Sequence, residues 1–346
     1  MSDDLAPKDL VPAGERGVVA AAVNLPDIVS RAGSAAVFAA EEFFYGRIRN
    51  EHTRSAYLVA VRRFLAWAEQ QGMELVRITP RDVGQYLDLL RNENLSIATR
   101  KQHLAAIRHF FDNLVTRHAI ILNPALSVRG DRYQVVEGKT PEVTVKGARE
   151  LLASIKTARS GEANEGEAGD HRRPVGLRDR AIVGILIYTA ARAGAVAKLK
   201  RDSFYHAGDQ WMLHFEEKNG KSREIPVRHD LEQMIIEYLD ATGIGFAPKD
   251  APFFRTTLRK TGRLTEHAMN VKDVCRMVKR RMKDTGLDGR LSPHSFRVTT
   301  ITDLLEQGVP LEDVQRLAGH ADPRTTRLYD RRQKKITRNI VERISI

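Results

Sequence analysis

The sequence predicts a mainly α-helical fold in two domains, with a small antiparallel sheet in the second domain (α+β). Apolar residues recur at helical spacing through most of the chain. One stretch, residues 210–227, instead reads as two strands joined at Asn219-Gly220, a pair that favours a tight hairpin turn. The length of 346 residues exceeds what one hydrophobic core usually serves, which indicates two domains.

The first part of the chain is predicted to be an arm followed by an all-α domain. Residues 1–35 mix Gly, Ala, Pro and acidic residues without sustained periodicity, so we expect a flexible arm with room for one short helix. Residues 36–125 show helical periodicity, and Thr79 and Pro80 supply an N-cap and a first-turn proline. Residues 126–140 lack a clear period and are bracketed by prolines, which is typical of a linker.

The second domain is predicted to span residues 141–346. An apolar helix, a turn of small residues and a second helix come first, and the hairpin follows. After a basic amphipathic helix, Pro293 is placed to begin another helix. Two short helices follow, one closed by Gly319 and one with Asp322 as N-cap, which puts Tyr329 about two turns into the last helix.

The charge balance indicates a polyanionic partner. The chain has 56 Lys and Arg residues against 44 Asp and Glu, a net charge of +12, which favours a polyanion that releases counterions from its phosphates on binding, with a basic but inert surface as the alternative. The single cysteine, Cys275, excludes an intramolecular disulfide and a CxxC zinc site. No apolar run approaches the length of a membrane span, and the acidic start lacks the basic region of a signal peptide, so we expect a cytoplasmic protein.

Six polar residues of the second domain are candidates for one catalytic site. His294 and Arg297 are three residues apart in a predicted helix and therefore project from one face. Taken singly, each of the six has a structural explanation, such as a surface cation or a core aromatic residue. Their order along the chain supports the functional interpretation: Arg192, Lys218, His294, Arg297, His320 and Tyr329.

This ordered set, with "HSFR" and "LAGH" as motifs and a tyrosine nine residues after the last histidine, resembles the tyrosine recombinase (phage integrase) family, the group of the Cre and Xer enzymes. The resemblance covers the whole second domain and, more loosely, the helical domain before it. It implies a core-binding domain and a catalytic domain that form a C-shaped clamp on duplex DNA. One position departs from the family, which usually carries an acidic residue where this chain has Ala195, so support for the basic cluster must come from elsewhere or be absent.

The resemblance implies a role for each member of the set. Arg192 would be the first catalytic arginine and Lys218 the hairpin lysine. His294 and Arg297 would form the His-x-x-Arg box. His320 would take the later His or Trp position, and Tyr329 would be the nucleophile.

The same residues suit DNA strand cleavage on chemical grounds. A phosphodiester under attack gains negative charge on its non-bridging oxygens, which the guanidinium groups of Arg192 and Arg297 can contact bidentately. A phenol with a reference pKa of about 10 is ionised in only about one molecule in a thousand at pH 7. Tyr329 therefore needs a base, and His294 is the candidate.

The departing deoxyribose oxygen needs a proton donor, because as an alkoxide it would be about as basic as hydroxide. Lys218 at the hairpin tip is the candidate donor, and Lys221 is the alternative. His320 would donate a hydrogen bond to the phosphate and orient it.

No metal and no other cofactor is expected. No cluster of Asp and Glu with metal-ligand character accompanies the set, and no GxxxxGK[ST] stretch exists to bind a nucleoside triphosphate. A phosphotyrosine ester retains the energy of the broken bond, so a 5′-hydroxyl can attack it and reseal the strand.

A basic face of the helical domain is predicted to contact DNA. Leu104, Ile107 and Phe111 are expected to point inward, which leaves cations on the outer face of the same helix. A merely solvated face is the alternative for any one of them. The predicted DNA-binding residues are Arg54, Arg100, Lys101, His103 and Arg108.

The resemblance also implies an assembly, in which four subunits act on two paired sites and exchange strands through a Holliday junction. The C-terminal tail, residues 335–346, carries an apolar stripe with no following element to cover it. The resemblance suggests that the tail docks on a neighbouring subunit, and docking on its own domain is the alternative. Two other functions remain open: a type IB topoisomerase, which relaxes supercoils as a monomer, and a DNA-binding regulatory protein with a vestigial site.

Overall fold

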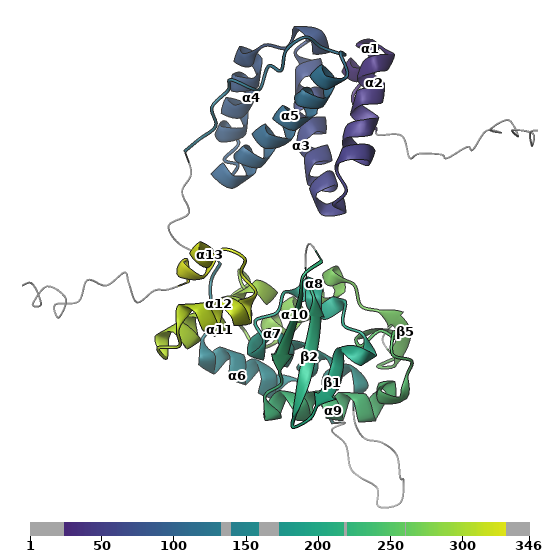
Figure 1. Ribbon diagram of the computed structural model, residues 1–346, viewed down its shortest axis with the longest axis vertical. Helices are drawn as coiled ribbons and strands as arrows, with labels where there is room; N and C mark the ends of the chain where they lie inside the picture. The colour runs from purple at the N-terminus through teal and green to yellow at the C-terminus, as the bar shows by residue number, and fades with distance from the viewer. Residues whose placement is uncertain (1–23, 133–139, 159–172, 218–219, 260, 330–346) are drawn as a thin grey trace, which may run out of the picture. The chain divides into compact units, whose positions relative to one another are not determined.

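The computed structural model describes residues 24–132, 140–158, 173–217, 220–259 and 261–329. The chain divides into two compact units, Met1–Gln134 and Val135–Ile346 (Figure 1). Each unit has its own hydrophobic core. Both units are mainly helical, and the strands of the described residues lie in the second unit. The predicted fold class is therefore confirmed.

The regular elements in the described part of the first unit are all helical. Its elements are α1 (Ile28–Arg31), α2 (Ser34–Glu41), the π-helical turn η1 (Glu42–Arg47), α3 (Glu51–Gln70), the 3-10 turn η2 (Leu75–Arg77), α4 (Pro80–Asn92) and α5 (Ile97–Thr116). The long helices begin where a side chain accepts a hydrogen bond from a first-turn backbone N–H, at Asn50, Thr79 and Ser96. Helix α5 packs against α2, α3 and α4 and buries Phe110 and Phe111 among them.

The arm predicted for residues 1–35 is too long. Helix α1 and the start of α2 lie within that range, and Ile28 and Val29 are 1% and 3% exposed in the core of the first unit. Burying these two side chains removes apolar surface from water, which holds the segment on the unit although it has no long helical period. Residues 1–23 of the predicted arm lie outside the described residues.

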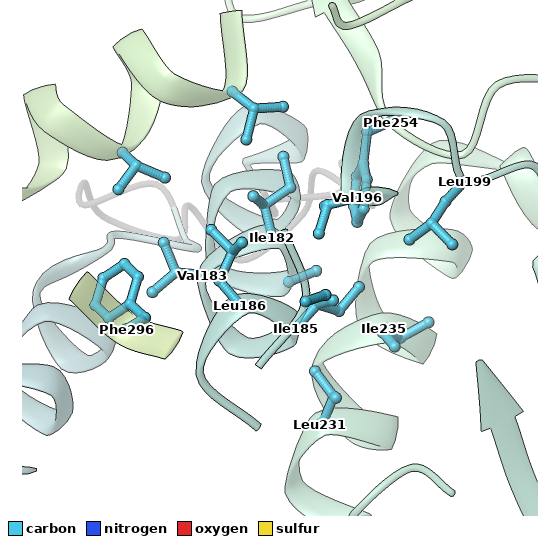
Figure 2. Close-up of a cluster of buried hydrophobic side chains, with 14 of the residues drawn as sticks. Ile182, Val183, Ile185, Leu186, Val196, Leu199, Leu231, Ile235, Phe254 and Phe296 are labelled. Atoms are coloured by element: carbon cyan, nitrogen blue, oxygen red, sulfur yellow. The ribbon is translucent and has the colours of Figure 1, made fainter. Parts of the chain in front are cut away.

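The second unit combines helices with two small sheets. Its helices are α6 (Val145–Ser154), α7 (Pro174–Tyr188), α8 (Ala193–Ala197), α9 (His229–Thr242), α10 (Val271–Asp284), α11 (Pro293–Glu306), α12 (Leu311–Ala318) and α13 (Pro323–Arg327), with 3-10 turns η3 (Arg201–Ser203) and η5 (Ile244–Phe246). Helix α7 packs against α6, α8, α9, α10 and α11. Apolar side chains cover several sides of α7, among them Ile182, Val183, Ile185 and Leu186, so this helix is buried all round (Figure 2). Within the described residues, every helix is too short or too polar to span a membrane.

A three-stranded antiparallel sheet contains the predicted hairpin. Strands β1 (Phe204–Ala207), β2 (Gln210–Glu216) and β3 (Ser222–Pro226) pair in the order β1-β2-β3. Leu213 lies opposite both Phe204 and Ile225, and all three side chains are buried, which fixes the register because a slip of one residue would expose them. The pattern does not predict β1, nor a second sheet of β4 (Arg255–Thr257) and β5 (Leu264–Ala268), because such short strands leave little periodicity.

The last three helices begin as the sequence predicts. Helix α11 starts at Pro293, Gly319 with a φ of +62° ends α12, and Asp322 caps α13. Helix α13 ends before Tyr329, which therefore lies just past the helix and not two turns into it. The predicted tail, residues 335–346, lies outside the described residues.

Candidate active site

Arg297 is almost completely buried, with 1% of its surface exposed. Its Nη1 donates a hydrogen bond to the carbonyl oxygen of Ala190 at 2.5 Å, and its Nη2 donates to that of Ala318 at 2.6 Å. These contacts fix the plane of the guanidinium, while its Nε makes no hydrogen bond within the described residues. Burial, followed by the charges of Arg192 and Arg223, lowers the pKa of Arg297 to about 10, so the group is a cation at pH 7.

His294 and Tyr329 come into contact although 35 positions separate them in the chain. A capping box between Ser292 and Ser295 fixes the start of α11, and His294 is its second residue. The Tyr329 hydroxyl lies 3.4 Å from Nε2 of His294, the length of a long hydrogen bond. Burial, followed by the charges of two neighbouring arginines, lowers the pKa of His294, so its neutral ring is able to accept the hydroxyl proton at Nε2.

His320 follows Gly319 directly and packs against Tyr329. The two rings stack with centroids 5.8 Å apart and an interplanar angle of 11°. Nδ1 of His320 lies 2.8 Å from the hydroxyl of Thr326, and both residues are buried. Burial, followed by the charge of Arg297, lowers the pKa of His320 to about 3, so the ring is neutral at pH 7. With the Thr326 hydroxyl donating to Nδ1, the ring carries its proton on Nε2 and can donate it to a phosphate.

Arg192 is the N-cap residue of α8 and pairs with an acidic residue of the hairpin. Its Nη1 donates to Oε2 of Glu217 at 3.1 Å, and Oε1 of the same carboxylate forms an ion pair with Nη2 of Arg223 at 3.1 Å. The side chains of Glu217 and Arg223 are 7% and 10% exposed, whereas that of Arg192 is 46% exposed. Ala195 is buried in the apolar core, so the carboxylate beside Arg192 comes from the hairpin and not from α8.

The two candidate lysines, Lys218 and Lys221, lie between β2 and β3 in the sequence. Lys218 lies outside the described residues. The backbone N–H of Glu217 donates to the carbonyl oxygen of Lys221 at 2.6 Å, and Gly220 has a φ of +70°, a conformation that glycine adopts without strain. Lys221 is exposed, and both lysines remain candidates for the general acid.

Five of the six predicted site residues are described, and they form one electrostatic cluster, since Arg192 and Arg297 lower the pKa of both histidines. Sequence reasoning missed Glu217, Arg223 and Thr326. The sequence could have indicated Glu217, because it directly precedes the candidate lysine. A carboxylate in a turn that is expected at a basic site has arginine and lysine side chains within reach to pair with. No spacing in the sequence distinguishes Thr326 from any other threonine near a helix start.

The predicted DNA-binding face of α5 is partly turned inward. His103 is 6% exposed, its Nδ1 lies 3.1 Å from the hydroxyl of Tyr86, and burial lowers its pKa. The prediction that His103 points outward is wrong, because its ring fills the core and supplies the buried phenol with a hydrogen-bond partner. Lys101, two residues before it, is exposed.

The arginines predicted to bind DNA make contacts within the first unit. Arg100 forms an ion pair with Asp131 at 2.7 Å, and Arg108 donates from Nε to a backbone carbonyl at 3.0 Å. The guanidinium carbon of Arg54 lies 5.5 Å from the centre of an aromatic ring. Lys101 is thus the strongest candidate of the set for a phosphate contact, because the three arginines make contacts within the first unit.

Two family models match the chain. The model described as "Phage integrase family" matches residues 162–335, and the model described as "Phage integrase, N-terminal SAM-like domain" matches residues 42–118. The tyrosine recombinase XerC of Pelobacter propionicus is 30% identical to this chain over 283 residues, which cover 80% of this chain and 84% of that protein.

Solved structures share the fold. The XerH site-specific recombinase bound to a palindromic difH substrate superposes with a TM-score of 0.64 and 17% identity, covering 90% of this chain and 86% of that one. A lambda integrase tetramer bound to a Holliday junction superposes with a TM-score of 0.60 and 15% identity, covering 90% of this chain and 78% of that one.

Proposed function

Because the chain belongs to the phage integrase family of tyrosine recombinases, we propose that it cuts and rejoins DNA at specific sites through a covalent 3′-phosphotyrosine intermediate. The contact of 3.4 Å between the Tyr329 hydroxyl and Nε2 of His294, in one cluster with the buried cation of Arg297, carries this proposal. A nucleophile, a neutral base and a fixed cation are the parts that transfer of a phosphoryl group to a phenol needs.

In the proposed cleavage step, Tyr329 gives its proton to His294 and its oxygen attacks the phosphorus of the scissile phosphodiester. Arg192 and Arg297 stabilise the negative charge that develops on the non-bridging oxygens. His320 donates a hydrogen bond from Nε2 to the same phosphate, because its Nδ1 is occupied by Thr326.

The bond between phosphorus and the 5′ oxygen then breaks, and that oxygen takes a proton from Lys218 or Lys221. The products are a 3′-phosphotyrosine ester and a free 5′-hydroxyl. Attack on the ester by a 5′-hydroxyl from a second strand reverses the steps, so strands are joined without metal or ATP.

The proposal extends to the assembly on DNA. The lambda integrase structure is a tetramer bound to a Holliday junction, and the XerH structure is bound to its difH substrate. For this chain we propose four subunits on two paired duplex sites, each acting as a clamp that binds DNA with both of its units. A Holliday junction is the proposed intermediate, and residues 335–346 would dock on the neighbouring subunit. Cytoplasmic action on DNA belongs to the same proposal. A chain shortened after Lys335 should bind a half-site but lose cooperative filling of the second.

A nicked suicide substrate that carries the protein's own site tests the chemistry, because the cleaved strand loses its 5′-hydroxyl fragment and the ester cannot be resealed. The wild-type protein should form an adduct with DNA that resists denaturant. Tyr329→Phe should bind the same DNA with unchanged affinity and form no adduct, since the hydroxyl alone is removed. An adduct in Tyr329→Phe would refute the assignment of the nucleophile. Relaxation of a supercoiled plasmid without joining of paired sites would indicate a topoisomerase.

A 5′-bridging phosphorothiolate substrate identifies the general acid, because its sulfur leaves without protonation. Lys218→Ala should cleave ordinary DNA slowly and the phosphorothiolate at nearly the wild-type rate. Rescue that is specific to Lys221→Ala would assign the role to Lys221 instead.

A further inference from the structure

The basic cluster of the candidate site has an acidic partner in an unexpected place. The residue three positions after Arg192 is Ala195, which is 6% exposed and packed in the apolar core. The carboxylate of Glu217, 25 positions further along the chain than Arg192, instead accepts the hydrogen bond from Nη1 of Arg192. A charge-assisted contact of this kind limits the positions that a half-exposed arginine side chain can take.

Glu217 is also the single carboxylate among three described arginines. Its Oε1 pairs with Nη2 of the buried Arg223, whose three guanidinium nitrogens make no hydrogen bond within the described residues. Arg192 and Arg223 in turn both act on the pKa of Arg297. Loss of the Glu217 charge would therefore leave mutual repulsion among the three guanidinium groups without compensation.

The same carboxylate touches the loop that carries His320. A Cβ atom added at Gly319 would lie 2.9 Å from Oε2 of Glu217, so the backbone of this loop lies directly on the carboxylate. The residue before Gly319 supplies the carbonyl oxygen that accepts a hydrogen bond from Arg297. Glu217 thus contacts Arg192 on one side and the loop before His320 on the other, and it directly precedes Lys218 in the chain.

We infer that Glu217 is a positioning residue, which takes the place of the acid missing at Ala195 and holds Arg192 in the orientation that meets the scissile phosphate. This inference rests on the proposed recombinase chemistry. Nε and Nη2 of Arg192 have no partner among the described residues, so the side chain can pair with Glu217 through Nη1 and still offer two donors to a phosphate.

Glu217→Gln tests the inference, because glutamine keeps the shape of the side chain and removes its charge. At saturating DNA we expect covalent adduct formation on the suicide substrate to slow by at least about tenfold. DNA affinity should be unchanged or tighter, since a negative charge near the phosphate is removed. The matched control is Glu216→Gln, which removes the same charge from the exposed neighbouring residue and should react at the wild-type rate.

A double-mutant cycle with Arg192→Ala separates positioning from a general effect on the fold. If Glu217 acts through Arg192, the double variant Arg192→Ala/Glu217→Gln should be no more than about twofold slower than Arg192→Ala alone. Thermal unfolding of each variant identifies any that are destabilised. For a destabilised Glu217→Gln, Glu217→Asp, which keeps the charge on a shorter side chain, takes its place in the same cycle.

Two results would overturn the inference. One is a Glu217→Gln rate within about twofold of wild type. The other is a defect of equal size in the wild-type and Arg192→Ala backgrounds, which would show that Glu217 acts independently of Arg192. Both presuppose an adduct with the wild-type protein, so a wild-type protein that formed none would refute the proposed function itself and with it this inference.

Discussion

Replacing Arg297 by methionine separates the contribution of this residue to stability from its contribution to chemistry. The change leaves the carbonyl oxygens of Ala190 and Ala318 without their donors, at a cost of about 2–6 kcal/mol for the two together. Against this, a pKa lowered from 12.5 to about 10 means that the folded protein disfavours the cation by roughly 3 kcal/mol. An uncharged side chain of similar length relieves that penalty.

The relief of about 3 kcal/mol offsets half or more of the cost of the two lost hydrogen bonds, so Arg297→Met should lower the free energy of unfolding by no more than about 3 kcal/mol. The rate of adduct formation should nevertheless fall by about a hundredfold or more, because a preorganised charge at the attacked phosphate is lost. Stability and rate therefore respond very differently to this one substitution.

Urea unfolding followed by circular dichroism gives the first quantity, and single-turnover cleavage of the suicide substrate gives the second. Arg290→Met is the control, since the side chain of Arg290 is 81% exposed in the loop before α11. A loss of more than about 5 kcal/mol would show that Arg297 is mainly a structural anchor, since the two lost hydrogen bonds would then dominate. A folded variant that cleaved at the wild-type rate would show that Arg297 has no part in the chemistry.

Three further experiments test the roles assigned to Thr326, to the two histidines and to Lys101. Thr326→Val should slow adduct formation by about tenfold without loss of folding, because Nδ1 of His320 loses the hydroxyl that sets its tautomer, and Thr326→Ser should restore the rate. The folded protein lowers the pKa of His320 to about 3 and also lowers that of His294, so these groups bind more protons in the unfolded chain below about pH 6.5. Their contribution to stability is therefore full above that pH and falls as the pH drops toward 3. Urea midpoints at pH 7 and pH 5 should show this loss, and His320→Phe should reduce it. Lys101→Ala should weaken DNA binding and reduce its salt dependence by about one unit of slope, and an unchanged slope would show that Lys101 is only a solvated side chain. His103→Ala should instead lower the stability of the first unit, because its ring is buried against Tyr86.

Local signals in the sequence predict much of the second unit. Proline at position 293 and the Asp322-Pro323 pair mark helix starts because cap chemistry depends on a few adjacent residues. The Asn219-Gly220 pair predicts the hairpin for the same reason. The spacing of His294 and Arg297 likewise needs one turn of helix and no tertiary information.

Contacts between distant residues are what the sequence does not reveal. Helical spacing does not show which polar residues of α5 lie at the edge of its apolar stripe. His103 is buried because Tyr86, from another helix, offers its ring a hydrogen-bond partner, and this contact is not visible in the sequence of α5. Arg192 at the start of a helix pairs with Glu217 at the end of a strand, and nothing in the sequence around either residue predicts its partner. The sequence allows one short helix within residues 1–35 but does not show that α1 is buried, because one helical turn is stabilised by the core that it joins and not by its own pattern.

The described residues of the candidate site carry more positive than negative charge, so the site favours an anion. Among the described residues of the second unit, Arg192 and Arg223 pair with the carboxylate of Glu217, whose charge also acts on Arg297. Burial lowers the pKa of both Arg223 and Arg297. A cation held where the fold disfavours it gains more from an arriving phosphate than a solvated cation does, because the phosphate replaces the hydration that burial removed. A bound phosphate should therefore raise these pKa values and stabilise the second unit by linkage. In the proposed mechanism, the buried charge that lowers the stability of the free protein would favour a phosphate that carries extra negative charge.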